Sequence, residues 1–283
     1  MGVLSGALGA VNGQHTLRDW NISSSEDLQA FVASNTLGGT GRRAGVKDWR
    51  GGFNLYQSGN TGQSLGAVKP GTAFTFTGSM DNIKGVVGPA MVSQLQVTID
   101  IEGGRIIMAQ VSFEGNGTLV KGPAVAADAT IPNPDSSMGC KVQLGTVVAA
   151  PVFTELTHVR TVTLTFSSAL QAYSDSSTAG FTLRKAGPLD AQVSISVYPD
   201  GDLSLLPQEG DIKALKVFID ADDFWLLNWV RFGEMSDVTV SRETHAVIGA
   251  TLNAGWSCAE NVDGTTPTMG KIQFPDDSFM FGS

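Results

Sequence analysis

The order of apolar and polar positions along the chain predicts a protein built mainly of β-strands. In four segments, apolar and polar residues alternate with the period of a half-buried strand. These segments are residues 53–56, 95–101, 159–166 and 193–197. The turn sequence EGGR then connects two such runs, so residues 95–113 predict a hairpin. Residues 238–252 predict the matching hairpin in the second half of the chain.

A densely apolar stretch at residues 224–230 also fits a strand. Alternation places Trp225, Leu227 and Trp229 on one face of it. Short strands separated by turns are typical of a β-sandwich or β-barrel. The aromatic residues Trp20, Trp49 and Trp256 are interpreted as core anchors.

Helix signals are few. Residues 24–27 resemble a capping sequence and predict a short helical turn into residues 28–31. Residues 62–68 and 203–206 predict one short helix in each half. Two long, Gly-containing, cationic segments, residues 33–45 and 175–187, are predicted to be loops that are either functional or mobile.

The chain contains an internal repeat. When positions 18 to 59 are aligned without a gap to positions 160 to 201, 15 of the 42 positions are identical, which indicates a duplicated domain. The matches include Leu28-Gln29-Ala30 with Leu170-Gln171-Ala172, Arg42 with Arg184, Asp48 with Asp190 and Tyr56 with Tyr198. Further along, the register of the match changes by one position, so that positions 97 to 99 align with positions 238 to 240. We call this correspondence the repeat alignment.

The repeat alignment also suggests where the domains divide. Residues 121–137 contain three prolines and no periodic apolar pattern, which is typical of a linker. We predict a first domain at residues 1–122, a Pro-containing linker at 123–137 and a second domain at 138–283.

Composition and charge narrow the function classes. The 283 residues are 42% hydrophobic and 16% charged, which excludes a disordered chain. The formal net charge of -9 disfavours stable binding of nucleic acid and suits a surface past which DNA slides. The first cation is Arg18, so no secretory signal pattern is expected, and no apolar run reaches the length of a membrane span. We therefore expect a protein made in the cytoplasm.

Candidate chemical sites are weak. The histidines His15, His158 and His245 are too scattered for a metal site. Cys140 and Cys258 are interpreted as free thiols, with one bridge left open. Residues 220–223 are predicted to be a turn rather than a calcium loop, and residues 39–45 do not fit a phosphate-binding loop. We predict no catalytic residue, no metal and no cofactor, and hence a protein that is not an enzyme.

The segment RAGVKDWRGGF at residues 43–53 resembles the "aGlkDWsGsf" segment of siphophage-type tail tube (major tail) proteins. The sequence RDWNI at residues 18–22 is similar to the N-terminal strand of that family. GQSL at 62–65 lies where the family has a short helix, and FEGNG at 113–117 is similar to its closing segment. The resemblance covers residues 11–120. In the second half Ala191-Gln192-Val193 replaces Trp49-Arg50-Gly51, so the first half carries the resemblance.

The resemblance implies an all-β fold of two tandem β-sandwich or barrel tail-tube domains, each with one short flanking helix. Family members form rings of six domains that stack into a tube through which DNA is ejected. Two domains in each chain imply a homotrimeric, pseudo-hexameric ring. The expected location is the tail of a bacteriophage virion, after synthesis in the bacterial cytoplasm. The expected partners are further copies of the chain, tape measure, tail terminator and tail-tip proteins, and genomic DNA in transit, with no membrane.

Two sets of site residues follow from this expectation. The candidates for contacts between rings are the loop cations Arg42, Arg43, Arg184 and Lys185. The candidates for an acidic lumen that repels phosphates are Asp100, Glu102, Asp237 and Glu243. Two alternatives remain open: a β-sandwich binding module of a baseplate or adhesin, and the inner-tube protein of a contractile injection system.

Overall fold

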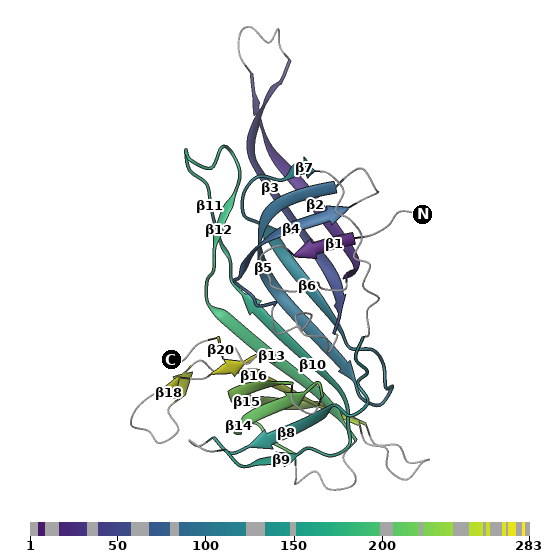
Figure 1. Ribbon diagram of the computed structural model, residues 1–283. Helices are drawn as coiled ribbons and strands as arrows, with labels where there is room; N and C mark the ends of the chain where they lie inside the picture. Colours follow the sequence, from purple (N-terminus) through teal and green to yellow (C-terminus); the bar gives the residue numbers. More distant parts are fainter. Residues whose placement is uncertain are drawn as a thin grey trace.

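The described part of the chain is all β. The computed structural model describes residues 5–8, 17–32, 39–57, 68–79, 85–122, 134–147, 151–198, 206–220, 223–239, 249–256, 259–260, 268–269, 271–275 and 279–280. All regular secondary structure in these residues is β-strand (Figure 1). The strands before residue 123 are β1 (Ser5–Leu8), β2 (Leu17–Phe31), β3 (Gly41–Tyr56), β4 (Ala73–Ser79), β5 (Gly85–Asp100), β6 (Met108–Gly115) and β7 (Val120–Gly122).

The remaining strands follow residue 137. They are β8 (Lys141–Gly145), β9 (Phe153–Glu155), β10 (Val159–Ser168), β11 (Gln171–Tyr173), β12 (Leu183–Lys185), β13 (Leu189–Val197), β14 (Ile212–Phe218), β15 (Phe224–Thr239), β16 (Gly249–Trp256), β17 (Ala259–Glu260), β18 (Thr268–Met269), β19 (Ile272–Gln273) and β20 (Phe279–Met280). We call residues 1–122 the first half and residues 138–283 the second half.

One antiparallel sheet runs through both halves. Its strand order is β2-β3-β6-β5-β10-β13-β16-β15-β14-β8-β9, and β4 and β1 attach beside β5. The order β2-β3-β6-β5 in the first half recurs as β10-β13-β16-β15 in the second. Likewise, β4 pairs with β5 and β1 with β4, as β14 pairs with β15 and β8 with β14. The strand pairings therefore repeat in the same chain order.

The register of these pairings repeats as well. In the β2–β3 pair, Ala30 lies opposite Arg42. Their counterparts in the repeat alignment, Ala172 and Arg184, lie opposite each other in the β11–β12 pair. The repeat alignment and the hydrogen-bond register thus describe the same correspondence between the halves.

The two halves meet edge to edge at β5 and β10. Seven residue pairs form this ladder, from Asp100 opposite Thr161 to Gln94 opposite Ser167. We call this ladder and the contacts at its two ends the junction. Because the ladder is continuous, the halves share a single sheet.

A second layer of strands covers the apolar face of the sheet. In β4, Phe74 and Phe76 pack on Phe113 of β6, with ring centroids 5.5 and 4.8 Å apart. In the second half, Phe166 of β10 packs on Phe274 at 5.2 Å. Each buried aromatic side chain of this kind stabilises the fold by roughly 1.5–3 kcal/mol. The buried residues form one cluster that extends through both halves.

Most predicted strands are confirmed. Residues 53–56, 159–166, 193–197 and 224–230 lie in β3, β10, β13 and β15. The hairpin at 95–113 is β5–β6. In the second half β15 pairs with β16 as predicted, although residues 240–248 of that hairpin lie outside the described residues.

The predicted helical turn at residues 24–31 is wrong, because these residues belong to β2. Pairing with β3 gives their backbone a partner along the whole segment, from Ser24 opposite Trp49 to Phe31 opposite Gly41. The predicted loops also contain strand: residues 41–45 begin β3, and β12 lies within residues 175–187. The ends of β2 and β3 therefore form a two-stranded arm beyond the body, which we call the first arm. The β11–β12 pair forms a shorter arm beside it, which we call the second arm (Figure 1).

The predicted helices at 62–68 and 203–206 lie outside the described residues, apart from Val68 and Leu206, which are buried. Residues 123–133 of the predicted linker also lie outside them. The following residues are held by the first half: the Ile107 amide donates to the Asp135 carbonyl at 3.0 Å, and the Ser137 amide donates to the Arg105 carbonyl at 2.8 Å. This end of the linker is therefore docked.

Candidate functional site

One face of the sheet carries uncharged polar side chains across both halves. Strand register places one row of them on β3, β6, β5, β10 and β13, namely Asn54, Gln110, Gln96, Thr165 and Gln192. A neighbouring row on β5, β10, β13 and β16 consists of Thr98, Thr163, Ser194 and Asn253. Alternate residues of a strand point to opposite faces, so both rows lie opposite the apolar core. We call these two rows the polar face.

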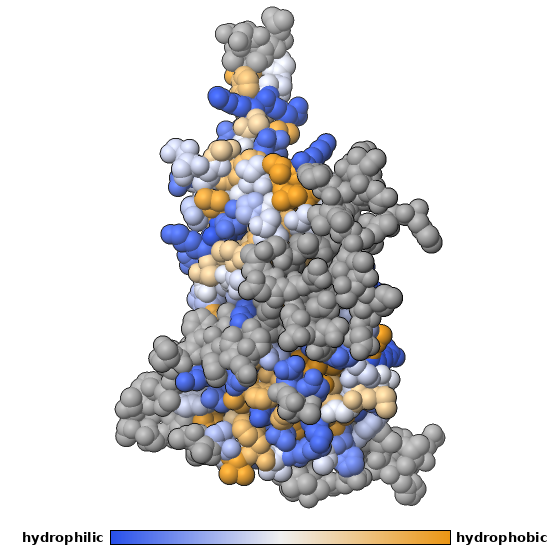
Figure 2. All heavy atoms as spheres, viewed as in Figure 1, coloured by the Kyte–Doolittle hydropathy of each residue, from blue (hydrophilic) through white to orange (hydrophobic). Residues whose placement is uncertain are grey.

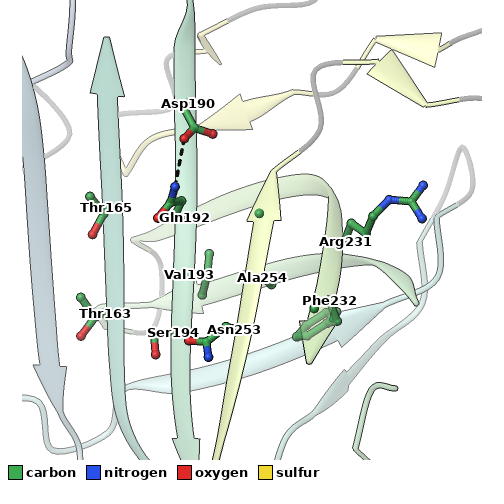
Figure 3. A pocket seen from close by; sticks show the side chains of 12 residues that line it. Thr163, Thr165, Asp190, Gln192, Val193, Ser194, Arg231, Phe232, Asn253 and Ala254 are labelled. Carbon is green, nitrogen blue, oxygen red and sulfur yellow. Dashed lines mark hydrogen bonds between the residues drawn. The ribbon is translucent and has the colours of Figure 1, made fainter. Parts of the chain in front are cut away.

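Over the second half, the polar face is hollowed into an open groove of about 540 Å³ (Figure 3). Its floor is lined by Thr163 and Thr165 of β10, Gln192 and Ser194 of β13 and Asn253 of β16. Asp190 lies at one end, where it accepts a hydrogen bond from Gln192 Nε2 at 3.2 Å. Phe232 is only 2% exposed, so it offers no aromatic platform to a ligand. The floor of the groove therefore presents hydroxyl and amide groups, and Asp190 and Arg231 are charged residues of its lining.

Arg184 forms a buried ionic cluster at one end of the junction. Its side chain is 5% exposed and donates to both carboxylate oxygens of Asp48, at 2.9 and 2.7 Å. It also donates to the Glu114 carboxylate and to the Gly115 carbonyl. Burial alone would lower the pKa of Arg184, but Asp48 and Glu114 outweigh it and raise the pKa. A cation of the second half is thus clamped by carboxylates from β3 and β6 of the first.

The chain next to Arg184 also joins β3 through its backbone. The Lys47 amide donates to the Gly180 carbonyl at 2.7 Å, and the Thr182 amide donates to the Lys47 carbonyl at 3.0 Å. Lys47 Nζ lies over the Phe181 ring, 5.8 Å from its centroid. The second arm is therefore fixed to the first half by both main chain and side chains.

The DWRGG motif, which carries the family resemblance, builds the first-half side of this cluster. Asp48 accepts from Arg184, while Trp49 on the opposite face is 3% exposed and donates from Nε1 to the Gly117 carbonyl at 2.8 Å. The indole lies so close to Gly115 that a Cβ there would overlap it. The motif thus places a carboxylate on one face of β3 and an anchor in the core on the other.

A second ionic cluster lies at the other end of the junction. Arg160 Nε donates to Glu102 Oε2 at 2.6 Å, and the Tyr198 hydroxyl donates to Glu102 Oε1 at 2.9 Å. The Arg160 guanidinium lies over the Tyr198 ring, 4.3 Å from its centroid. These hydrogen bonds hold the pKa of Glu102 below its ordinary value, and the one from Arg160 has a larger effect than the one from Tyr198. Both ends of the β5–β10 ladder are therefore closed by charged groups.

The predicted cations do not act as one set. Arg42 and Arg43 are exposed on β3 within the first arm. Lys185 is exposed on β12, with its Nζ 5.5 Å from the Tyr173 ring centroid. Arg184 differs from the prediction of a free loop cation, because its guanidinium is committed to Asp48 and Glu114 of its own chain. The repeat that aligns Arg42 with Arg184 and Asp48 with Asp190 was the available signal for this pairing.

The predicted carboxylates are likewise dispersed. Asp100 extends the polar face by its register with Thr161, but it is paired with Arg105 Nε at 3.1 Å. Glu102 is bound by Arg160 as described above. Asp237 belongs to β15, where its side chain is not described, and Glu243 lies outside the described residues. Sequence reasoning missed the polar face, although the Thr, Ser and Gln positions of the alternating strands form it.

Two strand edges that correspond to the joined edges of β5 and β10 have no partner among the described residues. Among the described strands, β2 pairs only with β3. Beyond Arg231, β15 pairs only with β16, so its other edge has no described partner there. In the repeated pairing order β2 is the counterpart of β10, and β15 is the counterpart of β5. Each half therefore leaves one edge without a described partner, and these two edges are the counterparts of those joined at the junction, although β9 and not β15 is the last strand in the sheet order.

Other chemistry is sparse in the described residues. No group of three or more His, Cys, Asp and Glu side chains there could hold a metal ion. Cys140 is buried, and burial raises the pKa of its thiol to about 11. Cys258, His15 and His245 lie outside the described residues. Asp223 donates its amide to Asp220 Oδ1 at 2.8 Å, as expected of a turn between β14 and β15.

No helix within the described residues is long and apolar enough to cross a membrane. In comparisons with family models and with curated proteins, the chain matches none.

Proposed function

We propose that this chain is a structural subunit with two tandem tail-tube domains, that copies of it join edge to edge into a closed ring, and that the rings stack into a bacteriophage tail tube. In this proposal each half is one domain, and the β5–β10 junction is a covalently connected version of the contact between neighbouring domains. Three chains then supply six domains. The protein has no catalytic role, and DNA passes through the tube without being held.

The observation that carries the proposal is the pair of open edges. Within one chain, an edge of β5 binds an edge of β10, and the counterpart edges, on β2 and on β15 beyond Arg231, have no partner among the described residues. An open edge presents unpaired amide and carbonyl groups and is a site for pairing with another chain. Because the two edges differ, the contact between chains is head to tail, and such a contact closes into a ring when its rotation closes.

The polar face supports a role as the inner wall. It crosses the junction, so edge-to-edge joining would continue it around the ring. Its two rows contain hydroxyl and amide groups, with Arg231 as a cation beside the first row, and affinity for DNA comes largely from many cations that neutralise phosphates. This wall differs from the acidic lumen predicted from the sequence, because neutral polar groups replace the expected carboxylates.

The groove over the second half favours a second candidate, a binding module for a neutral polar ligand such as a carbohydrate. Its hydroxyl and amide lining suits hydrogen bonding to such a ligand. The two candidates differ in outcome. A binding module gives discrete particles that retain a glycan, whereas a tube subunit gives rings or filaments in negative-stain images.

A cross-link tests the ring directly. The intrachain pair Thr98–Thr163 corresponds, in the repeat alignment, to Thr239 of one chain and Asn21 of the next. Paired β residues are close enough for a disulfide. We expect an oxidised Asn21→Cys/Thr239→Cys chain, in a Cys258→Ser background, to give covalent species that end at three chains.

The matched control is the Thr98→Cys/Thr163→Cys chain, which should cross-link within one chain only. Each single variant should give no species larger than a disulfide-linked pair. A double variant that stays monomeric in denaturing gels at every concentration, while the control closes, would refute the proposed ring.

A further inference from the structure

The two arms have the same construction but different surroundings. In the second arm, Ala172 lies opposite Arg184, whose guanidinium is buried against the first half. In the first arm, Ala30 lies opposite Arg42, whose side chain is exposed and makes no ion pair or hydrogen bond within the described residues. Charged and apolar side chains share the surface of this arm (Figure 2), where Leu28 and Phe31 are 56% and 48% exposed. The first arm therefore has the same pairing and the same arginine as the second arm, but its arginine has no described binding partner.

The second half also contains a counterpart of Asp48, the carboxylate that binds Arg184. Asp48, which accepts from Arg184, corresponds to Asp190 in the repeat alignment. Asp190 is exposed on β13 at the end of the groove, and its carboxylate receives only the Gln192 amide among the described hydrogen bonds (Figure 3). A carboxylate there has room for a guanidinium.

The two groups cannot meet within one chain. β3 and β13 are separated by β6, β5 and β10 in the sheet. Four strand spacings of about 4.8 Å place them roughly 19 Å apart, well beyond the reach of an arginine side chain. A pair between Arg42 and Asp190 would therefore have to join two chains.

We infer that Arg42 of one copy binds Asp190 of the next copy, reproducing between chains the latch that Arg184 and Asp48 form within a chain. This inference rests on the proposed ring, and it names the charged contact that fixes neighbouring chains in register. Pairing of β15 with β2 of the next chain would bring the first arm of that chain across β13, as β11–β12 crosses β3 at the junction.

The latch between chains is the simpler of the two. The counterpart of Glu114 in the second half is Gly255. The strand register shows this, because Gly255 lies opposite Gln192 just as Glu114 lies opposite Arg50. One carboxylate therefore replaces two. Arg231 of β15 lies opposite Gly255, so it adds a positive charge, like that of Arg42, near the site. The contact should be weaker than the intrachain cluster and more sensitive to salt.

Charge reversal tests the latch, with the rate of the Asn21→Cys/Thr239→Cys cross-link as the readout at fixed protein concentration and low salt. Adding Arg42→Asp should slow cross-linking at least tenfold, because two carboxylates then face each other. Arg43→Asp is the matched control: it reverses the same charge one residue along, on the opposite face of the strand, and should change the rate less than about twofold. Equal thermal melting of the two variants shows that the fold is intact.

Asp190→Arg should slow cross-linking as Arg42→Asp does, and the combined Arg42→Asp/Asp190→Arg chain should recover most of the lost rate. The latch is overturned if Arg42→Asp and Arg43→Asp behave alike, or if the combined chain is no faster than either single reversal. Those results leave the ring standing, since the parent chain still cross-links. A parent chain that never cross-links overturns the ring and the latch together.

Discussion

Replacing Arg184 with Met tests whether the ionic cluster at the junction stabilises the chain. Met retains much of the buried stem and removes the guanidinium, leaving Asp48 and Glu114 without their cation. Removing one member of a buried ion pair usually costs about 3–5 kcal/mol. Here the stranded carboxylates are 40% and 37% exposed, so water can solvate them in part. We therefore expect a loss of about 2 kcal/mol in the free energy of unfolding, after discounting for this screening.

Urea unfolding followed by tryptophan fluorescence measures this loss as a lower midpoint at an unchanged slope. Arg184→Lys should fall between Met and the wild type, because an ammonium keeps the charge but not the planar fork that binds Asp48 twice. Lys185→Met is the control at the neighbouring exposed position and should change stability by less than about 0.5 kcal/mol. The reasoning fails if Arg184→Met is as stable as the wild type, or if Lys185→Met costs as much.

Three further experiments test the packing and the ionisable groups. Gly115→Ala should cost about 1–3 kcal/mol in thermal or urea unfolding, because its Cβ would overlap the buried Trp49 indole, whereas Gly255→Ala, which has open space around it, should cost nothing. Cys140 should react with iodoacetamide at pH 8 about 100-fold more slowly in the native than in the unfolded protein, since its pKa is about 11 rather than 9.0; equal rates, measured on the Cys140 peptide by mass spectrometry, would contradict its burial. Glu102 has a lowered pKa, so its stabilising effect should be complete above its ordinary value of 4.5 and disappear as the pH falls through the lower native value. Glu102→Gln should therefore reduce the urea midpoint at pH 7 and reduce it less as the pH falls below 4.5, and a pH-independent effect would argue against this linkage.

The sequence was informative where local pattern and tertiary structure agree. Alternation at residues 159–166 predicted β10, and the repeat alignment agrees with the register later seen for Ala30–Arg42 and Ala172–Arg184. Sequence reasoning failed at residues 24–31, where a capping pattern suggested a helical turn and the adjacent β3 imposed a strand instead. Local propensity competes poorly with a full ladder of backbone hydrogen bonds.

The junction could not be predicted, because it depends on contacts between distant segments. Nothing local to Arg184 indicates that its partners are Asp48 and Glu114, and nothing in β5 or β10 alone specifies that their edges pair. The useful signal was the identity of charged positions within the repeat. Charged residues that remain identical in both copies, while surrounding positions have changed, fit a contact made twice.

The differences between the copies indicate how the two contacts divide their work. Within the chain Arg184 binds the two carboxylates of Asp48 and Glu114, whereas the corresponding positions between chains are Asp190 and Gly255. The halves of one chain are always near each other, so their junction forms at a high effective concentration and persists. A contact between chains exposes sheet edges that can also pair wrongly. A weaker latch there lets incorrect pairings dissociate, and the last chain of a ring gains stability by making two contacts at once. We infer that having one carboxylate instead of two at the contact between chains favours closed rings over irregular edge-to-edge polymers.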